Sequence, residues 1–228
     1  MKKLKRHTVE ENLEFVLNEN TPEEIKKQYR KAAKNLIKLM ENRKSKSVVI
    51  TSPNIGEGKS LSCVNLAKAL ADSGKSVLVI DANIHAPYIH CLFGLPNENG
   101  LTSVLSRRNF PAATVSDKIF AITSGPKIED ISAHLRSENM RKLIESSENW
   151  YDFILIDTPD LQKEDALVMN SFIAGILLVI RENYTKHTDL VKSVRKIKAS
   201  GGTLIGFLKS GCIREEATKQ NEVKDDKK

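Results

Sequence analysis

The sequence predicts an α/β protein with a doubly wound, mainly parallel sheet that carries helices on both faces. Six short apolar runs recur along the chain without polar–apolar alternation, as is typical of strands buried on both sides. Segments with helical periodicity separate several of the runs, and such alternation favours a parallel sheet. The six runs are Val48–Ile50, Val77–Ile80, Ile119–Ile122, Phe153–Ile156, Ile176–Ile180 and Leu204–Leu208.

The helices are predicted before and between these runs. The first begins at Thr21-Pro22, because a proline followed by two glutamates suits a helix N-terminus, and it runs to about residue 42. Four further helices are predicted at residues 59–73, 137–147, 163–173 and 187–199.

Composition divides the 228 residues into three parts. Residues 1–20 are predicted to form a flexible basic N-terminal segment, and residues 21–213 a single domain with a sizeable core. Residues 214–228 are polar and lack an apolar period, which predicts a disordered tail.

Composition also narrows the class of protein. No apolar stretch approaches the roughly 20 residues that span a bilayer, and no signal-peptide pattern follows the basic N-terminus. The three cysteines form neither a C-x-x-C pair nor a disulfide framework, so a cytoplasmic location is expected. The net charge of +7 is compatible with phosphates, nucleic acid or an anionic membrane surface and does not choose between them.

A phosphate-binding loop is predicted between the first apolar run and the helix at 59–73. Its glycines let backbone N–H groups turn toward one anion, and the helix N-terminus adds partial positive charge. Lys59 is expected to bridge the terminal phosphates of a nucleotide, and the Ser60 hydroxyl to ligate Mg²⁺. The pattern G-x-x-x-x-G-K-[ST] is relaxed here, because Pro53 stands at the first glycine position. It still indicates a fold of the P-loop NTPase type, with the nucleotide phosphates held by Asn54, Ile55, Gly56, Glu57, Gly58, Lys59, Ser60 and Leu61.

Two aspartates, Asp81 and Asp157, each follow an apolar run directly. Ligands of open α/β sheets bind at the carboxyl ends of the strands, where both residues are expected to lie. Asp157 is predicted to hold Mg²⁺ beside Ser60, and Asp81 to bind a metal-bound water or accept a proton. The alternative is that each aspartate caps the following helix or turn. The predicted catalytic residues are Lys59, Asp81 and Asp157, and the predicted Mg²⁺ ligands are Ser60, Asp81 and Asp157.

Over about residues 25–210, the order of these motifs resembles that of the bacterial tyrosine kinases of capsule and exopolysaccharide synthesis, in their cytoplasmic-domain form. The resemblance implies a fold related to the septum-site and partitioning ATPases, and transfer of the ATP γ-phosphoryl group to tyrosine. The segments that carry it are Gln28–Arg30, Ser47–Ser52, Gly56–Ser60, Asn65–Ala67, Gly74–Asp81, Gly100–Leu105, Thr123–Pro126, Tyr151–Phe153, Asp157–Pro159 and Asp165-Ala166.

The resemblance also implies cofactors and partners. These are ATP and Mg²⁺, a membrane-embedded adaptor of the polysaccharide chain-length type, and protein-tyrosine substrates. It implies a homo-oligomeric ring in which C-terminal tyrosines are phosphorylated between neighbours, and recruitment to the inner face of the cell membrane by a partner. No nucleic-acid partner is expected.

The chain departs from the family's pattern around the nucleotide. The second motif, usually Asp-x-Asp-x-Arg, has Asn83 and His85 at its last two defined positions. Leu61 replaces the usual hydroxyl residue after Ser60, and Ser210 aligns with the usual adenine-contacting asparagine. Arg181 and Ser210 are therefore the predicted contacts of the base or ribose, with a surface salt bridge as the alternative for Arg181.

The chain also departs from the pattern where the family assembles. The oligomer motif Glu-x-x-Arg-x-x-Arg reads Lys27, Arg30 and Ala33, and the C-terminal tail has no tyrosine. Three functions stay open on these grounds. The first is a protein-tyrosine kinase, and the second is a catalytically weak nucleotide-binding regulator of a polysaccharide assembly complex. The third is a partitioning-type ATPase, although the hallmark lysine of that class aligns with Asn54.

Overall fold

The computed structural model describes residues 16–107 and 112–211. Its centre is a seven-stranded sheet in the order β3-β4-β2-β5-β1-β6-β7. β3 and β4 pair antiparallel, and the other neighbours pair parallel. The strands are β1 Ser47–Thr51, β2 Val77–Asp81, β3 Ala113–Ser116, β4 Ile119–Ile122, β5 Phe153–Asp157, β6 Gly175–Arg181 and β7 Leu204–Ser210.

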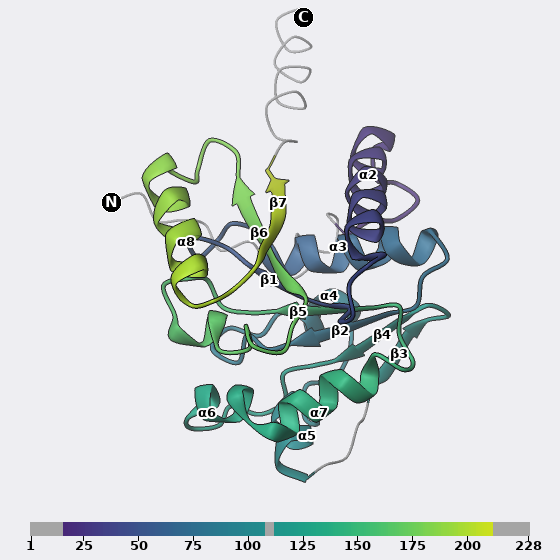
Figure 1. Cartoon of the computed structure of the whole chain (residues 1–228). Helices are drawn as coiled ribbons and strands as arrows, with labels where there is room; N and C mark the ends of the chain where they lie inside the picture. Colours follow the sequence, from purple (N-terminus) through teal and green to yellow (C-terminus); the bar gives the residue numbers. More distant parts are fainter. Residues whose placement is uncertain (1–15, 108–111, 212–228) are drawn as a thin grey trace, which may run out of the picture.

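Helices cover both faces of the sheet, which confirms the predicted fold class. α2 and α3 lie above the sheet, and α5, α6 and α7 lie below it (Figure 1). The helices are α2 Glu23–Met40, α3 Lys59–Asp72, α4 Ile89–Phe93, α5 Leu101–Arg107, α6 Ile131–Arg136, α7 Glu138–Ser147 and α8 His187–Ala199, with one 3₁₀ helix, η1 Glu164–Leu167.

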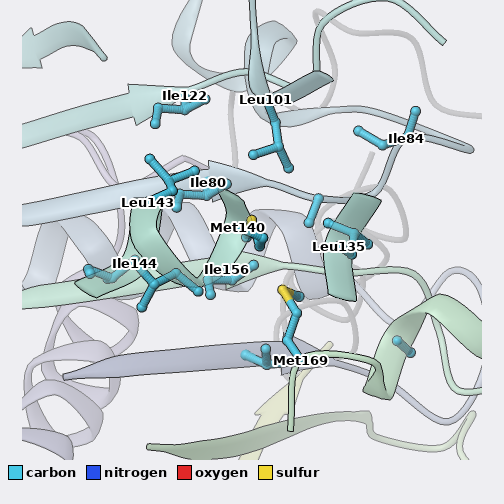
Figure 2. Close-up of a cluster of buried hydrophobic side chains, with 14 of the residues drawn as sticks. Ile80, Ile84, Leu101, Ile122, Leu135, Met140, Leu143, Ile144, Ile156 and Met169 are labelled. Carbon is cyan, nitrogen blue, oxygen red and sulfur yellow. The ribbon is translucent and has the colours of Figure 1, made fainter. Parts of the chain in front are cut away.

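The core consists of two layers, one on each face of the sheet. Successive residues of one strand point to opposite faces, so Leu78 and Ile80 enter one layer and Val77 and Val79 the other. Figure 2 shows the layer between the sheet and helices α5 and α7, where residues from both helices pack against the strands. The continuous apolar runs of the sequence are therefore strands buried on both faces.

The helix predicted at residues 163–173 is wrong. Only η1 forms there, and turns with hydrogen bonds to the third residue back follow it, such as Asn170 N–H to the Leu167 carbonyl. The buried contacts of this connection hold it in that form: Asp165 accepts hydrogen bonds, and Met169 enters the core.

Residues 16–20, assigned by composition to the flexible N-terminal segment, begin with two core residues. Val16 and Leu17 are buried, and the Leu17 N–H donates to Asn65 Oδ1 at 2.8 Å. Residues 1–15 and the predicted tail at 214–228 lie outside the described residues. Among the helices that the structure describes, none is both long and apolar enough to cross a membrane.

Candidate functional site

The predicted phosphate-binding loop joins β1 to α3. Gly56 and Gly58 have φ angles of +82° and +78°, a left-handed conformation that other residues rarely adopt. Gly58 directly precedes α3 and provides no side-chain cap, so the first N–H groups of the helix are available to an anion. Lys59 and Ser60, the first helical residues, are buried at this end of the helix.

Ser60 and Asp157 meet where α3 begins and β5 ends. The Ser60 hydroxyl donates to Asp157 Oδ2 at 2.6 Å, while Asp157 Oδ1 is buried without a hydrogen-bond partner in the described part of the chain. Burial raises the pKa of Asp157 to about 6, against the opposing effects of the Lys59 charge and the Ser60 hydrogen bond. An orphaned buried carboxylate oxygen beside a hydroxyl fits a bound Mg²⁺, which prefers such oxygen ligands.

Asp81 lies beside Asp157, because the two residues are register partners in β2 and β5. Its surroundings differ, since both of its oxygens accept backbone hydrogen bonds. Oδ1 accepts from Asn83 N–H, and Oδ2 accepts from the N–H groups of Tyr88 and Ile89, each at 3.1 Å. Burial and the neighbouring Asp157 charge raise the pKa of Asp81 to about 7, although these three bonds lower it.

The side chains of Asn54 and Glu57 stabilise the loop by hydrogen bonds to each other and to residues of the segment after β6. The Asn54 amide nitrogen lies 3.3 Å from both Glu57 Oε1 and Asp189 Oδ2, and Thr185 Oγ1 donates to Glu57 Oε1 at 2.9 Å. Burial raises the pKa of the Glu57 carboxyl. Ile55, which was also predicted to hold the phosphates, is 69% exposed.

Side chains from the end of β6, the turn that follows it and the end of β7 donate to three consecutive carbonyl groups of the loop. Tyr184 Oη donates to the Ile55 carbonyl at 3.2 Å, and Arg181 donates to the Gly56 carbonyl at 3.0 Å. Ser210 Oγ donates to the Glu57 carbonyl at 2.6 Å. Arg181 and Ser210, predicted to contact the base or ribose, thus bind the loop backbone in this structure.

The sequence did not predict the contacts of Tyr184 or Thr185, and no spacing rule reports them. It also gave no signal for the contacts of Asp165, which accepts hydrogen bonds from Ser132 and pairs with His85. This pair ties the loop after β2 to the segment after β5. Leu61 is half-buried and packs against the core layer between the sheet and helices α2 and α3.

The structure therefore brings Lys59, Ser60, Asp81 and Asp157 together at the carboxyl edge of the sheet. The glycine conformations and the uncapped helix fit phosphate groups, and the Ser60–Asp157 pair fits a magnesium ion. Arg181 and Ser210 lie on the other side of the same loop. The arrangement can bind a nucleotide by its phosphates and place two carboxyl groups of raised pKa beside it.

Comparisons with known proteins match this geometry. A family model for ParA, described as NUBPL iron-transfer P-loop NTPase, matches residues 43–223. The tyrosine-protein kinase YwqD of Bacillus subtilis is 34% identical over 189 residues, which cover 81% of this chain and 80% of that protein.

Solved structures with the same arrangement include two at 27% identity. The chimerical protein CapA2B2 has a TM-score of 0.78 and matches 87% of this chain and 89% of its own. The kinase domain of the Escherichia coli tyrosine kinase ETK has a TM-score of 0.77 and matches 82% of this chain and 75% of its own.

Proposed function

The chain belongs to the bacterial tyrosine kinases of the ParA-type P-loop family, and we propose that it transfers the γ-phosphoryl group of ATP to protein tyrosine in capsular or exopolysaccharide biosynthesis. The observation that carries this proposal is the Ser60–Asp157 pair, with its orphaned carboxylate oxygen, at the N-terminus of a helix that opens with Lys59. Phosphoryl transfer depends mainly on positioning and charge stabilisation, which such a site supplies.

The loop and the first turn of α3 hold the phosphates in this proposal. Backbone N–H groups from Asn54 to Leu61 surround them, and the Lys59 ammonium neutralises developing charge. Ser60 and Asp157 would hold Mg²⁺, with Asp81 nearby, and the ion would neutralise phosphate charge when bound.

Asp81 is the proposed general base for the tyrosine hydroxyl. A pKa of about 7 suits a group that must accept a proton near neutral pH. Its three backbone hydrogen bonds fix the position of the carboxylate against the loop after β2. Arg181 and Ser210 are proposed to contact the base or ribose from the outer side of the loop.

The remaining assignments of the proposal concern the chain as a whole. A kinase domain at residues 21–213 would be activated by the cytoplasmic part of a membrane-embedded adaptor of the chain-length type, which recruits it to the inner face of the membrane. Copies of the chain would act on one another in a homo-oligomer.

A specific observation favours a second function, that of a nucleotide-binding regulator with weak catalysis. Asn83, at the position of the family's second carboxylate, donates its amide to the Ala86 carbonyl at 3.0 Å. It stabilises the loop after β2 and brings no charge to the site. A partitioning-type ATPase is a weaker candidate, because Asn54 stands where that class has its lysine.

The test is a transfer assay on the purified chain with Mg-ATP and a glutamate–tyrosine copolymer, with and without the cytoplasmic tail of a candidate adaptor. Phosphotyrosine that depends on Lys59 and Asp81 supports the kinase. Nucleotide binding without transfer would instead favour the regulator, and phosphate release that rises with dimerisation would favour the ATPase.

A further inference from the structure

The chain contains four tyrosines, and all of them fall within the described residues. Tyr29, Tyr88 and Tyr151 are half-buried, and the Tyr151 ring lies against Phe120. Tyr184 is the exposed one, with 38% of its surface in solvent. A kinase that acts on its own copies therefore meets Tyr184 as the most accessible acceptor.

We propose that Tyr184 is a phosphorylation site, modified by the active site of a second copy of the chain, and that the phosphate weakens nucleotide binding by the copy that carries it. The proposal rests on the proposed kinase function and adds a specific acceptor and its consequence.

The first argument is the contact between Tyr184 and the phosphate-binding loop. Its hydroxyl donates to the Ile55 carbonyl at 3.2 Å, and the Arg181 guanidinium lies 5.3 Å from the ring centroid. Arg181 also donates to the Gly56 carbonyl. Tyr184 is thus one of the side chains that fix the loop. Within residues 16–107 and 112–211 its hydroxyl makes one hydrogen bond, which is exposed and easily exchanged for water.

The second argument is the side of the loop on which Tyr184 lies. Loops of this type bind phosphates through their N–H groups, which point to the inside. Tyr184 binds a carbonyl and is therefore on the outside, away from the phosphates of its own nucleotide. This position favours transfer from a second copy over transfer within one chain.

The transfer balances without any reactant beyond ATP. The phenolic oxygen of Tyr184 bonds to the γ-phosphorus, and the bond from that phosphorus to the β–γ bridging oxygen breaks to release ADP. The phenolic proton passes to Asp81 of the copy that holds the nucleotide.

Phosphorylation of Tyr184 would alter the loop in two ways. The modified oxygen no longer donates to the Ile55 carbonyl, and the phosphate, which carries about two negative charges, draws Arg181 away from the Gly56 carbonyl. The same charge repels the nucleotide phosphates. We expect nucleotide affinity to fall about tenfold, a modest effect for charges separated by a loop and partly screened.

The experiment separates the acceptor from the kinase. The full-length wild-type chain with Mg-ATP serves as kinase, and a mass-tagged Lys59→Met chain, unable to phosphorylate itself, serves as acceptor. Phosphopeptides of the tagged chain are mapped by mass spectrometry. Matched acceptors carry Tyr184→Phe or, as control, Tyr151→Phe in addition. The glutamate–tyrosine copolymer reports kinase activity in a parallel reaction.

Phosphate on Tyr184 of the tagged chain, lost in the Tyr184→Phe acceptor and kept in the Tyr151→Phe acceptor, supports the proposal. Phosphorylation of the copolymer without phosphate on Tyr184 overturns it and leaves the kinase function standing. Absence of phosphate from both substrates counts against the kinase function itself, and the proposal fails with it.

A second measurement tests the consequence. A fluorescent ADP analogue with Mg²⁺ is titrated into phosphorylated chain and into the same sample after tyrosine-phosphatase treatment. We expect about tenfold weaker binding by the phosphorylated sample, in line with the charge repulsion. Equal affinities would overturn the regulatory half of the proposal.

Discussion

The ends of β5 and β2 have the same sequence pattern, four apolar residues followed by aspartate, but different environments. Asp157 accepts one hydrogen bond from Ser60 and keeps one buried oxygen unpartnered among the described residues. Asp81 accepts three backbone hydrogen bonds, two of them from Tyr88 and Ile89 at the start of α4. The first carboxylate is open to a cation, while the second also supports the loop that follows it.

An aspartate at the end of a strand can both accept the backbone hydrogen bonds of a cap and take part in catalysis. The hydrogen bonds of Asp81 are those of a cap, and its raised pKa is that of a group poised for proton transfer. The Asp157 carboxylate makes no capping contact with the part of the chain that the structure describes, so its unpartnered oxygen is better explained by a ligand.

The largest expected effect comes from Lys59→Met. The Lys59 charge opposes the rise in the pKa of Asp157, so the substitution acts on the Asp157 side of the site. We expect tyrosine transfer to fall by about a thousandfold, as for the loss of a preorganised charge at a transferring phosphoryl group. Steady-state transfer to the copolymer measures this.

Lys68→Met is the matched control for that prediction. Lys68 lies on the same helix but donates to the Leu17 carbonyl, away from the loop. We expect the transfer rate of the Lys68→Met variant to remain within about threefold of the wild-type rate, because the contact that it loses lies outside the phosphate-binding loop. An equal loss in both variants would show that α3 had been disturbed as a whole.

Asp157→Asn is expected to separate catalysis from stability. An amide keeps an oxygen for the Ser60 hydroxyl but brings no negative charge, so transfer should fall about a hundredfold and need more Mg²⁺. The Tm of the metal-free chain should not fall, since the charge that is removed is buried and its pKa is raised. Transfer assays over a Mg²⁺ series and thermal unfolding give the two readouts, and a lower metal-free Tm would assign Asp157 a structural role.

Asp81→Asn, unlike Asp157→Asn, should lower the stability of the fold as well as the rate of transfer. An amide has one acceptor oxygen, so at least one of the three backbone N–H groups loses its partner, which lowers the Tm by about 3 °C. Transfer should fall about tenfold or more through loss of the base. Asp117→Asn, at an exposed turn, is the control and should leave the Tm unchanged. A loss of transfer with an unaltered Tm would show that the backbone hydrogen bonds of Asp81 do not stabilise the fold.

The sequence predicted most of the fold because its signals were local. Six strands are continuous apolar runs in the sequence, and the loop before Lys59 has the residue spacing of a phosphate-binding loop. β3 was missed, because it is a four-residue edge strand whose side chains are partly exposed and give no apolar run. Residues 163–173 have helix-forming composition, yet buried contacts of Asp165 and Met169 hold them in turns.

The site was predictable where chemistry follows from spacing and not where it depends on distant pairs. Ser60 and Asp157 follow from the loop pattern and the strand end. The contact of Arg181 with Gly56 joins residues 125 positions apart, and that of His85 with Asp165 joins residues 80 positions apart. Neither contact produces a regular spacing of residues in the sequence, so the two contacts are found only in the folded structure.

The smallest expected effect concerns pH. In the folded chain the pKa values of Asp157 and Asp81 are about 6 and about 7, above their ordinary value of 3.8. Between about pH 4 and pH 7 the folded state therefore binds more protons than the unfolded state, and the free energy of unfolding decreases as the pH rises. This destabilisation is absent below that window and complete above it.

The prediction is that Asp157→Asn gains stability over the wild-type chain as the pH rises from about 5 to about 8, reaching a Tm difference of about 3 °C without metal. Asp81 contributes to the difference in the same direction, because the Asp157 charge that raises its pKa is absent from the variant. Saturating Mg²⁺ should reduce the difference or reverse it, because the ion binds the charged carboxylate of the folded wild-type chain. Thermal unfolding of both chains across this pH range, with EDTA and with Mg²⁺, measures it. A difference that does not change with pH would mean that Asp157 is already ionised at low pH, and the contrast with Asp81 would then lie in hydrogen bonding alone.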